Sequence, residues 1–173
     1  MKWYRVLFEA LMLLSAVFLQ VGVLARLGLP GATPDLVLVL VTALAMQRGP
    51  LVGVVSGFSA GLLLDLVSPS AGTLGISALL LVIVGLVAGR AGGDDHAIIR
   101  PLVVVTIAST FFVLGYAFLS GLLDRRSLIW DDLPTILGTE ILYALILATF
   151  VYPGLVWFER KLSSVGTGRF RDI

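Results

Sequence analysis

Glycine recurs at every fourth position of one apolar stretch, at Gly49, Gly53, Gly57 and Gly61, and Asp65 follows one step later. Four residues of α-helix turn the chain by about 400°, so these positions form a slowly winding stripe without side chains. Glycine inside a helix costs roughly 1 kcal/mol relative to alanine. A repeated cost of this kind indicates close approach of another backbone, which is how helices associate in lipid. The stripe therefore predicts a contact between helices inside a membrane.

The composition assigns the whole chain to the membrane class. Hydrophobic residues make up 58% of the 173 residues and charged residues only 13%, and the mean hydropathy is +1.06. These values lie far from those of a soluble domain. The length accommodates about six membrane spans and no separate aqueous domain. We therefore expect one all-α transmembrane domain, a six-helix bundle that covers residues 1–173.

Hydropathy and helix signals place the six spans. The predicted ranges are 4–27, 34–47, 50–67, 74–88, 101–123 and 133–158, with a cytoplasmic tail over 159–173. Thr33 is the expected N-cap of the second span, with Pro34 at its first helical position. Pro153 is expected to interrupt the sixth span, and the tail from residue 163 onward is expected to be loose.

The cations of the loops predict the orientation in the membrane. With the N-terminus inside, the cytoplasmic cations are Lys2, Arg5, Arg48, Arg90, Arg100, Arg160, Lys161, Arg169 and Arg171, and the external ones are Arg26, Arg125 and Arg126. This nine-to-three distribution favours two cytoplasmic termini, since cytoplasmic loops carry the excess of Lys and Arg.

Few polar side chains lie in or beside the spans. Asp65 either marks the external end of its helix or contacts a partner or a neighbouring loop. Glu140 lies about 10 Å along the last span if that helix begins at Leu133, where it would need a polar partner. It is merely interfacial if the span begins near Glu140 itself. Glu9 is expected to pair with Arg5, four residues away.

No pattern in the sequence points to catalysis or to a cofactor. The chain has no cysteine and one histidine, which excludes disulfides, thiolate zinc sites and multi-histidine metal sites. No phosphate-binding glycine loop, Ser-His-Asp set or nucleic-acid-binding surface is visible. We expect no enzyme activity, no metal, no cofactor and no nucleic-acid partner.

The segment from Pro34 to Gly89 carries a family resemblance. Gly57-Phe58-Ser59-Ala60-Gly61-Leu62-Leu63-Leu64-Asp65 resembles the G-F-x-x-G-L-x-x-D stretch of the rod-shape-determining MreD family. Pro34-Asp35-Leu36, Arg48-Gly49, Gly53, Leu74-Gly75 and Gly85 extend the match. The matching region covers about a third of the chain, and the length and six-span plan agree with the family.

The resemblance implies a non-enzymatic protein of the bacterial inner membrane that acts in cell-wall elongation. It implies a bitopic MreC-like partner and an indirect link between MreB filaments and the synthase complex of RodA and a penicillin-binding protein. The family is also thought to share its fold with the substrate-binding subunits of energy-coupling-factor transporters.

Two other functions stay open beside the scaffold. One is a membrane subunit that binds a small molecule between its helices, and the other is handling of a lipid-linked wall precursor. The central parts of the first, fifth and sixth spans are almost wholly apolar, which favours the scaffold. The side of the helix bundle to which the glycine stripe faces discriminates further between a scaffold and the other functions. A stripe that faces lipid is a groove for a partner helix, and a stripe that faces the bundle is internal packing.

Overall fold

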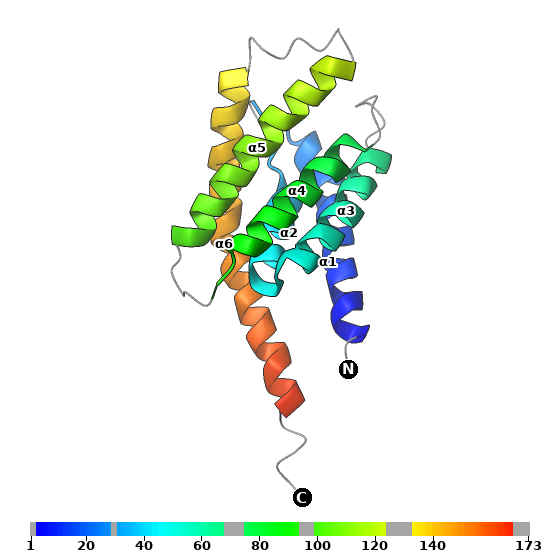
Figure 1. Cartoon of the computed structure of the whole chain (residues 1–173), viewed down its shortest axis with the longest axis vertical. Coiled ribbons are helices and arrows are strands. Elements are labelled where there is room, and N and C mark those ends of the chain that lie inside the picture. The colour runs from blue at the N-terminus through cyan, green and yellow to red at the C-terminus, as the bar shows by residue number, and fades with distance from the viewer. Residues whose placement is uncertain (1–2, 29–30, 68–74, 94–98, 124–132, 168–173) are drawn as a thin grey trace, which may run out of the picture.

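The computed structural model describes residues 3–28, 31–67, 75–93, 99–123 and 133–167, and all regular elements among them are helical. The elements in chain order are α1 Trp3–Gly22, the short 3-10 helix η1 Leu24–Arg26, α2 Leu36–Arg48, α3 Pro50–Val67, α4 Ile76–Ala91, α5 Ile99–Leu123 and α6 Leu133–Thr167. The helices form one elongated bundle in which α1 begins and α6 ends at the same end (Figure 1). We call this the terminal end, and we call the opposite end the distal end.

Helix α2 is the centre of the bundle and contacts each of the other five α-helices. Ten consecutive residues, from Val37 to Met46, are buried. A run that is apolar on every side has no lipid-facing or water-facing stripe, which is the pattern of a helix packed all round. The other helices thus surround α2 and expose their large apolar side chains on the outside, as Phe18, Leu51 and Phe150 do.

Four helices are long and apolar enough to cross a membrane, and these are α1 with η1, α3, α5 and α6. Helices α2 and α4 are apolar but shorter, with 13 and 16 residues. At 1.5 Å per residue α2 is about 20 Å long, less than the roughly 30 Å of a bilayer's hydrocarbon core. The all-α prediction is confirmed, whereas the count of six membrane spans stays a prediction.

Two local predictions at the helix ends are wrong. Asp35, rather than Thr33, is the N-cap of α2, because its side chain accepts a hydrogen bond of 2.9 Å from the backbone N–H of Leu38. Pro153 does not interrupt the last helix, which continues through it to Thr167. Residues 163–167, which were expected to belong to a loose tail, are therefore helical. The lower part of α6 projects past the other helices (Figure 1).

Candidate functional site

The glycine stripe packs α3 against α4 within the chain. A Cβ atom added at Gly53 would overlap the carbonyl group of Gly85, and one at Gly57 would overlap the carbonyl group of Leu81. A Cβ at Gly61 would overlap the backbone of Ala78. The two backbones therefore touch along the length of the stripe, and we call this contact the glycine seam.

Of the two alternatives for the stripe, the glycine seam matches internal packing, because helix α4 occupies this face at Gly53, Gly57 and Gly61. Gly49 has a different role from the other three glycines. It lies between α2 and α3 with a φ of 91°, a left-handed conformation that glycine adopts without steric cost.

Asp65 links the end of α3 to the start of α4. It is 5% exposed, and its Oδ2 accepts hydrogen bonds from the backbone N–H of Gly75 at 2.8 Å and of Ala78 at 3.4 Å. The first N–H groups of a helix have no partners within the helix, so this carboxylate caps α4 from a neighbouring helix. Of the two predicted roles, the contact with a neighbouring segment is the one that the hydrogen bonds show.

Glu140 lies inside the protein near the distal end. Helix α6 begins at Leu133, two turns before Glu140, and the Glu140 side chain is 5% exposed. The backbone N–H of Asp35 donates to its carboxylate, while its Oε1 has no hydrogen-bond partner among the described residues. The helix start at Leu133 and the burial of Glu140 fit the first of the two alternatives, in which Glu140 needs a polar partner, and its position in the membrane stays a prediction.

Asp35 and Gln20 complete a polar cluster around Glu140. The Asp35 carboxylate is 6% exposed and interacts with the Gln20 side chain as well as with the start of α2. Gln20 in turn accepts a hydrogen bond of 2.9 Å from the backbone N–H of Val37. Three helices, α1, α2 and α6, thus bring amide and carboxylate groups to one place.

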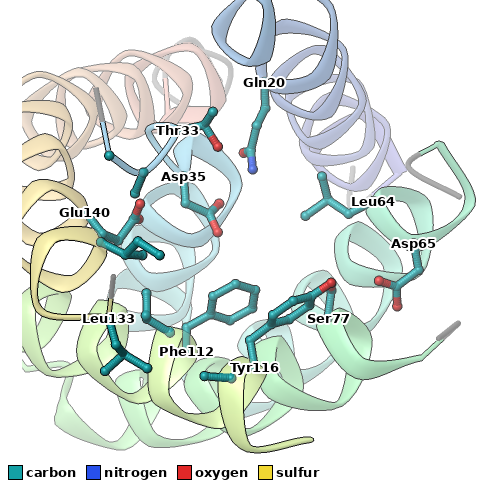
Figure 2. Close-up of a pocket in the computed structure, with 15 residues that line it drawn as sticks. Gln20, Thr33, Asp35, Leu64, Asp65, Ser77, Phe112, Tyr116, Leu133 and Glu140 are labelled. Atoms are coloured by element: carbon teal, nitrogen blue, oxygen red, sulfur yellow. The ribbon is translucent and has the colours of Figure 1, made fainter. Parts of the chain in front are cut away.

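These groups open into a cavity of about 390 Å³, which we call the distal cavity. Figure 2 shows Glu140 and Asp35 side by side, with Gln20 opposite Phe112 and Tyr116 and with Asp65 beyond Leu64. The residues that line the cavity are Gln20, Gly31, Ala32, Thr33, Asp35, Leu64, Asp65, Ser77, Phe112, Val113, Tyr116, Ala117, Leu133, Ile136 and Glu140. None of these lining residues is Lys, Arg or His.

A second hollow lies between α1 and α6 and is almost wholly apolar. We call it the α1/α6 groove, and its volume is about 460 Å³. Its walls and floor are formed by Phe8, Met12, Ser15, Ala16, Leu19, Leu36, Leu40, Phe150, Val151, Gly154, Leu155 and Trp157. It follows α1 from Phe8 to Leu19, about 17 Å at 1.5 Å per residue. Gly154 is exposed in this groove, and a Cβ atom added there would meet no neighbour within 4 Å.

Glu9 forms a salt bridge with Arg48, which ties α1 to the end of α2. The pairing of Glu9 with Arg5, one helical turn away, stays a prediction, because the Arg5 side chain lies outside the described part of the structure. The salt bridge of Glu9 with Arg48 lies far from the distal cavity, which is built at the other end of α1 and α2.

The described residues contain no group of three or more His, Cys, Asp or Glu side chains that could hold a metal ion. The polar groups of the distal cavity are carboxylates, an amide and hydroxyls, and the lining includes neither a histidine base nor a cysteine nucleophile. Such a set of groups suits binding through hydrogen bonds and charge.

The apolar helices define a multi-pass helical membrane protein. Its glycine seam packs α3 against α4, and its distal cavity offers polar groups for binding. A family model described as rod shape-determining protein MreD matches residues 2–161. The chain therefore belongs to the MreD family, which confirms the resemblance seen in the sequence and places the protein in rod-shape determination. Neither a comparison with curated proteins nor one with solved structures finds a match.

Sequence reasoning found only part of the distal cavity. Asp65 and Glu140 stood out because carboxylates are rare in apolar spans. Asp35 follows a proline and precedes an apolar run, which is a signal for an N-cap, but Thr33 competes for the same role. Gln20 and Tyr116 carry no sequence signal of their own, because only the packing of α1 and α5 brings them to the cavity.

Proposed function

We propose that this MreD family protein is a non-enzymatic scaffold of the cell-wall elongation machinery. In this proposal its six helices all lie in the bacterial cytoplasmic membrane, with both termini in the cytoplasm. It binds the membrane helix of an MreC-like bitopic partner and thereby helps to couple MreB filaments to the RodA and penicillin-binding-protein synthases. Membership of the MreD family supports the role in rod-shape determination, and the α1/α6 groove is the observation that supports docking of a partner helix.

The α1/α6 groove suits a helix better than the glycine seam does. The seam is filled by α4, whereas the groove opens between α1 and α6, whose described residues make no close backbone contact with each other. Ser15, Ala16 and Gly154 are small residues along it, and small residues allow helix backbones to approach closely in lipid. The exposed Phe150 and Trp157 extend the apolar edge beside them. A single apolar helix from a bitopic protein matches this shape and chemistry.

Replacement of Gly154 tests the groove. A Cβ atom added at this position meets no neighbour within 4 Å, so we expect the folded Gly154→Leu protein to accumulate in the membrane as the wild type does. The leucine side chain fills the space that a partner helix would occupy. Overpacking costs about 1–3 kcal/mol, which corresponds to a loss of roughly five- to 150-fold in the association constant.

The matched control is Gly138→Leu, because Gly138 lies on the same helix, is exposed, and also has no neighbour within 4 Å of an added Cβ. Co-purification of an MreC-like protein from detergent extracts measures the effect, and immunoblotting measures abundance. Loss of the partner with Gly154→Leu alone supports the proposal. Equal retention by both variants at normal abundance contradicts it.

The distal cavity favours a second candidate function, that of a membrane subunit that binds a small molecule. Its volume of about 390 Å³ lies within the range of ligand sites. Its polar groups come from the ends of the helices, so the apolar centres of α1, α5 and α6 do not argue against it. Retrieval of a bound metabolite from the purified protein by mass spectrometry would favour this function over the scaffold.

A further inference from the structure

The distal cavity brings two buried carboxyl groups together, and none of its described lining residues carries a positive charge. Asp35 and Glu140 interact with each other, and both are more than nine-tenths buried. Every lining residue of the cavity is neutral or acidic. Buried carboxylates are costly unless they are paired and hydrogen-bonded. The existing contacts satisfy only part of this requirement.

Glu140 provides an acceptor that the described part of the chain leaves unused. Its Oε1 has no hydrogen-bond partner there, and its side chain lies at the cavity beside Asp35 (Figure 2). Asp65 differs in this respect, because its carboxylate already caps α4 through Gly75 and Ala78. The unsatisfied acceptor therefore lies on the Glu140 and Asp35 side of the cavity.

Aromatic side chains lie across the cavity from Gln20. The rings of Phe112 and Tyr116 are stacked, with centroids 6.2 Å apart and planes 26° from parallel. The faces of aromatic rings attract cations within about 6 Å. Carboxylates on one side and aromatic rings nearby form a lining that suits an organic cation. A resident metal ion fits less well, because the described residues offer no three-ligand group for it.

We propose that the distal cavity binds a cationic group, an ammonium or a guanidinium, through Glu140 and Asp35. The group donates to the free Oε1 of Glu140 and balances the charge of both carboxylates. Its source is either a basic side chain of a protein segment at the membrane surface or a free small amine. This inference does not depend on the α1/α6 groove, because the cavity lies at the distal end and shares no lining residue with it.

Butylguanidinium is the probe, with butylurea as its uncharged match of similar size and shape. Calorimetric titration of the purified full-length protein in detergent should show saturable binding of butylguanidinium and none of butylurea. Glu140→Gln and Asp35→Asn should each weaken the binding by roughly 30-fold or more, since each removes one partner of a buried charge pair. Asparagine is as good an N-cap as aspartate, so α2 should remain intact in the second variant.

Asp65→Asn is the matched control, because it removes one negative charge from the same cavity without affecting the free acceptor. It should weaken binding by less than about threefold if the contact is specific to Glu140 and Asp35. An equal loss in all three variants indicates general attraction to negative charge and overturns the assignment. So does a Glu140→Gln variant that binds as the wild type does. Failure of the wild type to bind butylguanidinium or butylammonium also overturns it.

Two further arms identify the source of the cation. Protein purified with an MreC-like partner should exclude the probe if the partner supplies a basic side chain, and should bind it unchanged if the ligand is a free amine. Arg125 and Arg126 precede α6 in the sequence, in a segment outside the described residues. A higher probe affinity after Arg125→Gln and Arg126→Gln would show that the chain supplies its own cation, and would refute an external ligand.

Discussion

Replacement of Gly57 by alanine tests the glycine seam with the smallest possible side chain. The added Cβ would lie 2.7 Å from the carbonyl carbon of Leu81, whereas carbon atoms pack at about 3.5–4.0 Å. Relief of this overlap requires α3 and α4 to separate locally by about 1 Å. The contact at this point is between backbone atoms of the two helices, so no flexible side chain can move aside to relieve the overlap.

The expected loss of stability follows from two opposing contributions. Overpacking of this kind costs about 1–3 kcal/mol, and the better helix propensity of alanine returns up to about 1 kcal/mol. From the middle of the overpacking range, the net loss is about 1 kcal/mol. For a chain of this size, each kcal/mol shifts Tm by about 2–4 °C. We therefore expect Gly57→Ala to lower Tm by about 2–4 °C.

Thermal unfolding of the purified protein in detergent, followed by circular dichroism, measures this difference. Gly138→Ala is the control, because an added Cβ there meets nothing within 4 Å and only the gain in helix propensity remains. Its Tm should equal or exceed that of the wild type. A Gly57→Ala protein as stable as Gly138→Ala would refute the account of the seam as direct backbone contact.

The opposed pair Gly53 and Gly85 offers an internal check on the same reasoning. A Cβ atom at either residue overlaps the carbonyl group of the other, so both substitutions force the same separation of α3 and α4. The second alanine should therefore cost less than the first, because neighbouring substitutions that share one contact are not additive. Full additivity of the two losses in Tm would show that the helices relax independently at each site.

Three further outcomes follow from the fold and from the proposed function. Asp65→Ala should destabilise the protein by about 1–2 kcal/mol in thermal unfolding, because the cap of α4 is lost, and Asp65→Asn should be milder. Glu9→Gln should lower stability by up to about 1 kcal/mol in the same measurement, because it removes one partner of a partly buried salt bridge. A periplasm-active phosphatase should be active when fused at residue 128 and inactive at residue 173, and the reverse at either position would contradict the orientation.

Hydropathy and helix signals predicted most of the helices because they report on single segments of the chain. The range 50–67 predicted for the glycine helix coincides with α3, and α2, α4 and α5 begin and end within three residues of the predicted bounds. The stripe at Gly53, Gly57 and Gly61 correctly indicated a close backbone contact. It could not indicate the neighbour, because a glycine face looks the same whether it meets α4 or another protein.

The distal cavity was harder to predict because it depends on several helix ends meeting. Glu140 could be read as buried or interfacial until the first residue of α6 was known. Asp35 became a site residue only when α6 placed Glu140 beside it. Sequence patterns within one helix do not show which residues of other helices lie beside it. The lining of the distal cavity is decided by the relative positions of α1, α2, α5 and α6.

The burial of α2 makes the start of this helix depend on segments that are distant in the sequence. The Asp35 side chain interacts with Gln20 of α1, and the Asp35 backbone N–H donates to Glu140 of α6. Helix α3, by contrast, follows α2 after the single residue Gly49, so these two form a local hairpin. The N-terminal end of the central helix therefore acquires its polar surroundings only in the complete bundle, whereas its C-terminal end is fixed by its immediate neighbour in the sequence.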